Sequence, residues 1–253
     1  MGNSIIKVAE LVKKYDNFTA VKGISFEVQQ GEIFGLLGPN GAGKTTTLEI
    51  IETLRPKTSG KVWVDQMDLD KQAQDIKKII GVQLQAAGFY PNLNLKEIIE
   101  LFGGLYNATI DPLALLQSVQ LEDKAKSKFK HLSGGQKQRF SIATTLINQP
   151  KIIFLDEPTT GLDPQARRNL WELIKSLKEK GTTVVITTHY MDEAEILCDR
   201  VAVVDAGTII KQGSPDQLTD ELLAGGFTRT KKVKEANLED VFLSLTGKEL
   251  REL

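Results

Sequence analysis

The residues best suited to chemistry lie in a glycine-rich stretch, GPNGAGKTT. It follows the apolar run IFGLL at 33–37 and precedes a helical pattern, the context that the motif G-x-x-x-x-G-K-[ST] requires. Glycines let successive backbone N–H groups converge on an anion, and a helix start adds positive potential. Lys44 can then reach terminal phosphates, and Thr45 can offer a hydroxyl to Mg²⁺. The predicted nucleotide site comprises Gly38, Pro39, Asn40, Gly41, Ala42, Gly43, Lys44, Thr45 and Thr46.

A pair of carboxylates closes a second apolar run, IIFLDEP at 152–158. Asp156 at the end of this run would bind Mg²⁺ through water. Glu157 would lie beside the γ-phosphate and polarise a water molecule. Two solvated acids at a strand end would give the same letters. Their presence in one chain with a phosphate loop favours the catalytic interpretation.

The stretch LSGGQKQR at 132–139 is typical of a helix start with unusual features. Ser133 and Gln136 form a capping box, S-x-x-Q, which by itself stabilises any helix. The two glycines between them, Gly134 and Gly135, leave the backbone amides bare. Lys137 and Arg139 stand in the first turns, where cations are unfavourable unless an anion is close. We interpret the stretch as a second anion-binding helix start, so that phosphates are held from two sides.

Elements of two kinds must position these residues. Strands are predicted for the runs at 5–11, 33–37, 61–64, 152–156, 183–188 and 200–205. Several are continuously apolar, as expected of strands buried on both faces. Helical faces are predicted for Leu48, Ile51 and Leu54, and for Leu170, Ile174 and Leu177. Alternating strands and helices predict an α/β fold with a largely parallel sheet.

Residues 86–150 break this alternation, because their patterns predict helices and no convincing strand. We therefore expect an α/β core formed by 1–85 and 151–215, with a helical subdomain inserted at 86–150. A C-terminal helical tail is predicted for 216–253.

Composition narrows the classes of function. The 253 residues hold 32 Lys and Arg against 33 Asp and Glu, a formal charge of −1 that gives no support to bulk nucleic-acid or anionic-membrane binding. Cys198 is the single cysteine, so no intrachain disulfide can form and a reducing compartment fits. No apolar run approaches the length of a membrane-spanning helix, and no secretory signal is recognisable. We expect a soluble, cytoplasmic protein.

Four motifs, GPNGAGKTT, LSGGQKQR, IIFLDEP and TTHYMDEAE, in this order and spacing resemble the nucleotide-binding subunit of ABC transporters. The resemblance covers about residues 5–215. It implies a P-loop NTPase (RecA-like) core with a mainly parallel sheet, an N-terminal antiparallel β part and the inserted helical subdomain. It also implies that two cassettes pair head to tail. Ser133, Gly134, Gly135 and Gln136 would then cap the ATP on the opposite chain's phosphate loop, and its γ-phosphate would be the missing anion.

Further positions follow from the resemblance alone. Tyr15 matches the aromatic residue that stacks on adenine, although a tyrosine here could equally be core. Gln85 matches the glutamine that touches Mg²⁺ and water, with Gln83, two residues away, as the alternative. His189 matches the histidine that contacts the γ-phosphate, although a lone histidine is more often structural. Asp163 matches a loop that crosses the dimer interface, and it also fits the N-cap of the helix that Pro164 opens.

The resemblance implies an ATPase that uses ATP and Mg²⁺ and drives a separate membrane-spanning permease from the cytoplasmic face of the membrane. A second nucleotide-binding subunit, identical or paralogous, would be its partner, with no nucleic acid. The tail LEDVFLSLTGKELREL resembles the drug-exporter-like subfamily, which implies export.

Two other functions are possible for a chain with these motifs. The first is a soluble ABC ATPase acting on a ribosome or DNA, but the paired cassettes and the long coiled coil of such proteins are not recognisable. The second is a scaffold that binds ATP without turnover, against which Glu157 argues.

The segment GFYPNLNLKEII at 88–99 is the predicted contact with the membrane partner. Phe89, Tyr90, Pro91 and Leu93 crowd apolar bulk into an expected surface loop, and such patches usually mark interfaces. The alternative is that these residues anchor the helical subdomain.

Overall fold

The computed structural model describes residues 4–83 and 88–227 of the chain. The chain divides into two compact units, Met1–Leu218 and Thr219–Leu253. All elements of the site described below belong to the first unit. Within the described ranges, no helix is long and apolar enough to cross a membrane.

A six-stranded sheet in the order β10-β9-β3-β8-β7-β6 is the centre of the first unit. Its strands are β3 (Ile33–Leu37), β6 (Ile80–Gln83), β7 (Ile152–Asp156), β8 (Thr183–Thr188), β9 (Arg200–Asp205) and β10 (Thr208–Gly213). All neighbours pair in parallel except the β9–β10 hairpin. Every residue of β3, β7 and β8 is buried, which explains why these strands are continuously apolar or nearly so. The predicted parallel sheet is confirmed.

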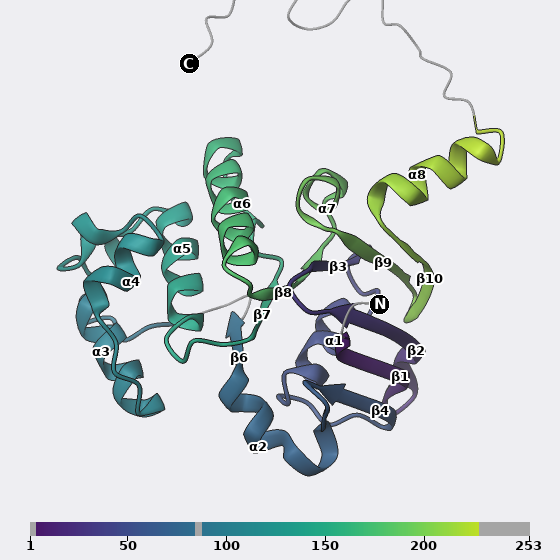
Figure 1. Ribbon diagram of the computed structural model, residues 1–253, viewed down its shortest axis with the longest axis horizontal. Helices are drawn as coiled ribbons and strands as arrows, with labels where there is room; N and C mark the ends of the chain where they lie inside the picture. The colour runs from purple at the N-terminus through teal and green to yellow at the C-terminus, as the bar shows by residue number, and fades with distance from the viewer. Residues whose placement is uncertain (1–3, 84–87, 228–253) are drawn as a thin grey trace, which may run out of the picture. The chain divides into compact units, whose positions relative to one another are not determined.

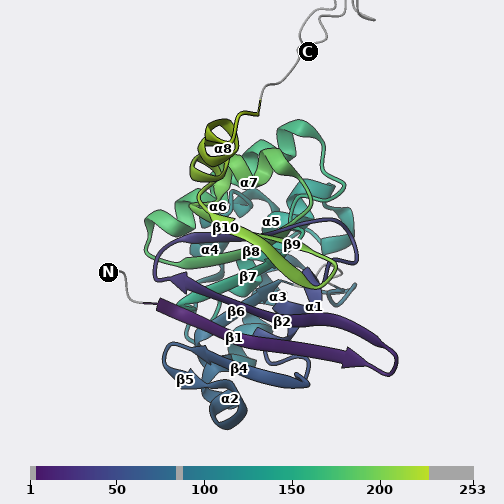
Figure 2. The ribbon, with the colours of Figure 1, turned by 90° about the vertical axis from the view of Figure 1, so that its right-hand side faces the viewer.

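A smaller antiparallel sheet is formed by β1 (Ser4–Tyr15), β2 (Phe18–Gln29), β4 (Ser59–Val64) and β5 (Met67–Asp68), in the order β2-β1-β4-β5 (Figure 2). Its inner face packs on the main sheet, where the rings of Phe26 and Phe34 stack with centroids 5.4 Å apart. Strands β2, β5, β6 and β10 are not among the predicted runs. In β2 only one face is apolar, and its polar residues interrupt the pattern.

Helices cover both faces of the main sheet. Helix α1 (Lys44–Ile51) and helix α2 (Leu69–Ile79) join the core shared with the small sheet, whereas α6 (Pro164–Glu179) and α7 (Met191–Leu197) pack on the other face. The predicted face of Leu170, Ile174 and Leu177 is buried in α6. The face predicted after the phosphate loop is wrong at one position, because α1 ends at Ile51 and Leu54 beyond it is 54% exposed.

The described residues between β6 and β7 form helices, as predicted. They include α3 (Leu95–Tyr106), α4 (Pro112–Ser118) and α5 (Gly134–Thr145), grouped beside the β6 side of the main sheet (Figure 1). Two short 3₁₀ turns, Glu122–Lys124 and Phe129–His131, connect α4 to α5. The predicted helix after 214 is present as α8 (Pro215–Ala224). Residues 228–253 of the predicted helical tail lie outside the described residues.

An aromatic cluster holds the helical segment together. The ring of Phe89 meets those of Phe102, Phe129 and Phe140 at centroid distances of 6.2, 4.6 and 5.2 Å. Phe89 therefore anchors these helices, which is the alternative stated for this residue. Its neighbour Tyr90 is 58% exposed.

Candidate active site

The phosphate loop connects the C-terminal end of β3 to the start of α1. Gly43, the residue before α1, has a φ of +95°, and a Cβ there would lie 2.5 Å from the carbonyl oxygen of Ala20. A Cβ on Gly38 would lie 2.0 Å from the carbonyl oxygen of Val204. Both positions therefore accept only glycine, since a side chain would require the backbone of neighbouring strands to move.

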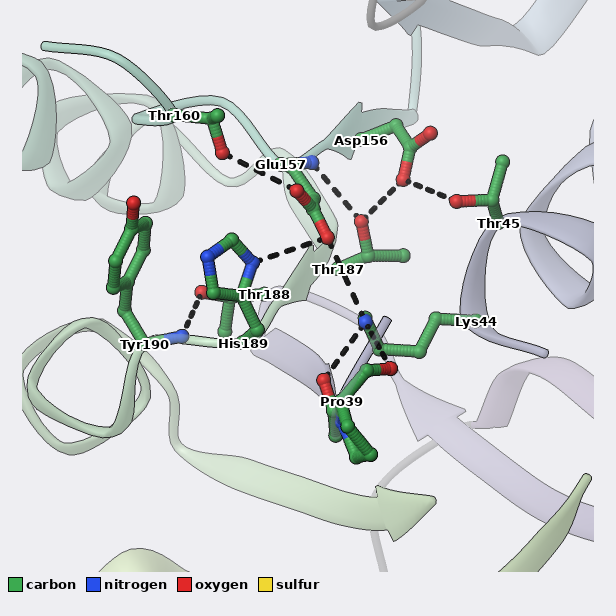
Figure 3. Close-up of polar contacts among 11 residues, drawn as sticks. Pro39, Lys44, Thr45, Asp156, Glu157, Thr160, Thr187, Thr188, His189 and Tyr190 are labelled. Carbon is green, nitrogen blue, oxygen red and sulfur yellow. Dashed lines mark hydrogen bonds and ion pairs between the residues drawn. The ribbon is translucent and has the colours of Figure 1, made fainter. Parts of the chain in front are cut away.

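Lys44 points into this loop. Its ammonium donates hydrogen bonds to the carbonyl oxygens of Gly38 (2.8 Å) and Pro39 (3.0 Å), and its side chain is only 4% exposed (Figure 3). The ammonium also lies 3.6 Å from Oε1 of Glu157. Two carbonyl oxygens and the carboxylate of Glu157 therefore compensate this buried charge within the chain, at the loop where the motif predicts phosphates.

Asp156, the last residue of β7, accepts hydrogen bonds from the hydroxyls of two threonines. Thr45 donates to its Oδ1 over 3.1 Å, and the hydroxyl of Thr187 on β8 donates to the same oxygen (Figure 3). Burial raises the pKa of Asp156, and the charge of Glu157 adds to this rise. The hydrogen bonds from Thr187 and Thr45 and the charge of Lys44 act against it. The structure thus brings together two predicted oxygen ligands from distant parts of the sequence.

Glu157 occupies a position between a lysine and a histidine. Its backbone is left-handed, with φ +47°, and its amide donates to the carbonyl oxygen (3.2 Å) and the hydroxyl (3.0 Å) of Thr187. Oε2 accepts a hydrogen bond from Thr160 (3.2 Å). Oε1 lies 3.2 Å from Nδ1 of His189, although not in hydrogen-bonding geometry (Figure 3). This carboxylate is held at the edge of the phosphate loop, where it can orient a water molecule toward a phosphate.

A cavity of about 380 Å³ lies over the loop. Its lining includes Asn40, Lys44, Thr45 and Glu157, together with Tyr15 at the end of β1 and Phe18 at the start of β2. Tyr15 thus lines the cavity, and it is also partly buried against the core shared with the small sheet, so both interpretations given for it stay open. A wall with an aromatic ring beside a phosphate cradle fits a nucleotide whose base stacks on the ring.

The stretch LSGGQKQR at 132–139, called the signature stretch below, forms the capping box that its sequence predicts. It lies apart from this cavity. Ser133 caps α5: its hydroxyl accepts from the amide of Gln136 (3.3 Å), and the amide of Ser133 donates to Oε1 of Gln136 (3.0 Å). Ser133 and Gly134 are exposed. Among the described residues, those lining the cavity include no member of 133–136. The fold of one chain does not bring the two anion-binding loops together.

Gly134 and Gly135, the two glycines of the signature stretch, differ in the space around them. A Cβ on Gly135 would lie 2.9 Å from the Cβ of Ala166 on α6, so the packing of α5 against α6 favours glycine there. A Cβ on Gly134 would approach no atom nearer than 3.7 Å, the Cδ2 of Leu162. The chain itself therefore gives no steric reason for Gly134.

The cations near the signature have partners within the chain. The ammonium of Lys137 lies 5.9 Å from the ring centroid of Phe129, and Arg139 donates to Oε1 of Gln120 over 2.9 Å. Both cations therefore have local contacts, and their relation to an external anion stays a prediction.

Of two further predicted residues, Asp163 and Gln85, the structure describes only the first. Asp163 caps α6 and accepts from the amides of Gln165 (3.0 Å) and Ala166 (2.9 Å), which confirms the predicted cap. Gln85 lies outside the described residues. Gln83, its alternative, is the last residue of β6, is 3% exposed and is absent from the lining of the nucleotide-sized cavity.

Three residues of the site were missed by sequence reasoning. Thr187 and Thr160 hold Asp156 and Glu157, and Glu52 lies buried at the end of α1 with Oε1 unpaired among the described residues. A threonine at the polar end of the run TVVITT was the available signal for Thr187. Nothing in the sequence distinguishes Glu52 from a solvent-exposed glutamate.

Glu52 leads to a prediction about stability and pH. Burial, then the charges of Asp156 and Glu49, raise the pKa of Glu52 from 4.5 to about 8. Between these values the unfolded chain releases the proton and the folded chain keeps it, so stability falls as pH rises, by about 1.4 kcal/mol per unit. We expect Glu52→Gln to remove this slope. Between pH 5.5 and 7.5 the variant should gain about 3 kcal/mol relative to wild type in urea unfolding.

The control for this measurement is Glu100→Gln, which removes a solvent-exposed carboxylate from α3. Its unfolding free energy should follow the wild-type pH dependence. Equal slopes for Glu52→Gln and wild type would show that Glu52 ionises normally in the folded chain.

Comparison with known proteins decides the family. The ABC transporter family profile matches residues 21–160, more than half of the chain. The chain belongs to the ABC transporter family. It is 42% identical, over 87% of this chain and 72% of the relative, to the linearmycin resistance ATP-binding protein LnrL of Bacillus subtilis (strain 168). It is 35% identical to the Nod factor export ATP-binding protein I of Cupriavidus pinatubonensis, over 98% of this chain and 93% of that protein.

Solved structures show the same relationship. A dimeric ATP-binding cassette in a post-hydrolysis state with ADP and Pi is 30% identical, with a TM-score of 0.75, covering 83% of this chain and 98% of the other. The cbiO1 protein of Clostridium perfringens, part of the ABC transporter complex cbiONQ, is 29% identical with a TM-score of 0.78, covering 87% and 92%. This ABC protein is therefore an ATP-binding subunit with the ATPase fold and activity of its family. The alternative of a ribosome- or DNA-directed ATPase is not supported.

Proposed function

We propose that this ABC subunit hydrolyses ATP with Glu157 as the residue that polarises the attacking water. The observation that carries the proposal is the position of Glu157 at the edge of the phosphate loop, between Lys44 and His189. Lys44 and the amides of residues 38–46 would bind the phosphates, His189 would contact the γ-phosphate, and Tyr15 would stack on adenine. Phosphate release by the purified chain, compared between wild type and Glu157→Gln, tests this proposal.

Mg²⁺ fits the residues present. Thr45 and Asp156 offer oxygen ligands already joined by a hydrogen bond, and a nearby dication would counter the raised pKa of Asp156 by favouring its ionised form. Among the described residues, no cluster of three or more His, Cys, Asp or Glu could hold a metal alone. Mg²⁺ suits such a site because it keeps several waters and takes other ligands from phosphates. Gln85 is proposed as a further contact to this ion.

A head-to-tail dimer would complete the site. Ser133 and Gly134 are exposed, and Gly134 has no steric reason within its own chain, so we infer that the partner's phosphates approach them. A two-fold arrangement lets both signatures meet a phosphate loop in the same way. Asp163, which caps α6 beside the start of α5, would lie at the same interface.

We propose three functional parts. Residues 1–85 and 151–215 would bind ATP, residues 86–150 would carry the signature and contact the membrane partner, and residues 216–253 would form the tail. The partner would be a separate membrane-spanning permease, with this subunit on the cytoplasmic face. Two relatives are named for linearmycin resistance and for Nod factor export, which supports export as the direction.

A second prediction concerns residues 88–99, the proposed contact with the membrane partner. Phe89 is committed to the aromatic cluster, so a charge there would unfold the helical subdomain, whereas Tyr90 is exposed. We expect Tyr90→Asp to fold and bind ATP like wild type and to lose co-purification with the permease from membranes at least tenfold. Ile210→Asp, at an exposed position of β10 outside residues 86–150, is the matched control. Unchanged recovery of Tyr90→Asp with the permease would move the docking site elsewhere.

A further inference from the structure

The ring of Tyr190 lies against the ring of His189. Their centroids are 4.1 Å apart and their planes meet at 38°, and Figure 3 shows the tyrosine beside the imidazole, away from Glu157. The amide of Tyr190 donates to the hydroxyl of Thr188 over 3.0 Å, which fixes the backbone at this point. His189 is thus bounded by an aromatic ring on one side and by a carboxylate on the other.

Arg167 on α6 contacts the same tyrosine. Its Cζ lies 4.8 Å from the centroid of the Tyr190 ring, within the range of a cation–π interaction. Its Nη1 lies 3.4 Å from Oδ2 of Asp192, in the first turn of α7. The guanidinium is therefore held by the Tyr190 ring and by the Asp192 carboxylate, and neither contact involves the phosphate loop.

Arg167 also belongs to the start of α6. Its amide donates to the carbonyl oxygen of Asp163, the residue that caps this helix, over 3.0 Å. A continuous series of contacts consequently runs from the proposed dimer interface at Asp163 through Arg167 and Tyr190 to His189, and then to Glu157 at 3.2 Å.

We propose that Arg167 and Tyr190 are positioning residues for His189. The imidazole is 28% exposed and its Nδ1 has no hydrogen-bond partner among the described residues, so hydrogen bonding from this atom does not fix the ring. The Tyr190 ring restricts rotation of the imidazole, and Arg167 keeps the Tyr190 ring in place. A movement of the first turn of α6 would therefore change the position of His189 through the side chains of Arg167 and Tyr190. This inference rests on the proposed contact of His189 with the γ-phosphate.

The experiment measures kcat and KM for ATP of the purified subunit. Arg167→Leu and Tyr190→Ala should each lower kcat about five- to tenfold and leave KM within twofold, because binding groups are intact and only the orientation of His189 is lost. Tyr190→Phe keeps the ring and Arg167→Lys keeps the charge, so both should recover most of the activity. Arg168→Leu is the matched control, since this neighbouring side chain is exposed and donates to Gln165 over 3.1 Å.

A His189→Ala background separates the inference from the proposed function. His189→Ala alone should lower kcat, and adding Arg167→Leu should lower it no further, because the residue to be positioned is gone. If His189→Ala kept wild-type kcat, the proposed role of His189 would fail, and this inference with it. If His189→Ala lowered kcat but Arg167→Leu acted equally in both backgrounds, or had no effect in either, only the inference would fail. Unfolding and ATP-dependent dimerisation of each variant, unchanged from wild type, exclude a loss of fold or assembly.

Discussion

Glu157→Gln should bind ATP with nearly wild-type affinity and hydrolyse it at least about a hundredfold more slowly. The amide has the shape of the carboxylate and can still accept a hydrogen bond from Thr160, so the loop geometry is retained. It cannot take a proton from the attacking water, and general-base catalysis typically contributes about 10²- to 10⁴-fold. The main contacts of Lys44, to the carbonyls of Gly38 and Pro39, do not involve Glu157 and should persist.

The measurement is steady-state phosphate release, with nucleotide affinity determined separately by equilibrium binding. Glu172→Gln, a carboxylate on the exposed side of α6, is the control for loss of one negative charge and should retain wild-type turnover. Turnover by Glu157→Gln close to that of wild type would assign water activation to another group.

Ser133→Arg should abolish the ATP-dependent dimer while leaving nucleotide binding to the monomer unchanged. In a Glu157→Gln background, a two-fold dimer is expected to accumulate when ATP is added, because hydrolysis no longer separates the two chains. An arginine at an exposed signature serine would fill the space into which the partner's phosphate loop must come. Ser133 does not line the nucleotide-sized cavity of its own chain, so the monomer should bind ATP normally.

Two further variants separate the interface from the helix cap. Ser133→Asp retains an N-cap of equal quality but places a negative charge against the partner's phosphates, so it should also block dimerisation. Ser214→Arg is the matched control, because Ser214 and Gln217 form an equivalent capping box elsewhere in the chain. Light scattering should show dimers for Ser214→Arg and monomers for both Ser133 variants. Dimers of all three would disprove the proposed interface.

Local sequence determined the parts of this protein that depend on backbone geometry and burial. The loop at 38–46 requires glycine where neighbouring carbonyl oxygens leave no room for a Cβ, so its motif is readable without a structure. Strands β3, β7 and β8 are buried on both faces, and their apolar runs therefore predict them. The capping box of Ser133 and the cap at Asp163 join residues only two or three positions apart, which local patterns describe well.

Tertiary structure alone decided which distant side chains meet. Strand β2 and residue Leu54 were misjudged, because half-buried strands and helix ends depend on what packs against them. Contacts of this kind join Lys137 to Phe129, Arg139 to Gln120, Asp156 to Thr45 and Thr187, and Arg167 to Tyr190. The widest, between Thr45 and Asp156, spans 111 positions. The buried state of Glu52 is of the same kind, since the pKa of a carboxylate is set by solvent access and neighbouring charges and not by its place in the sequence.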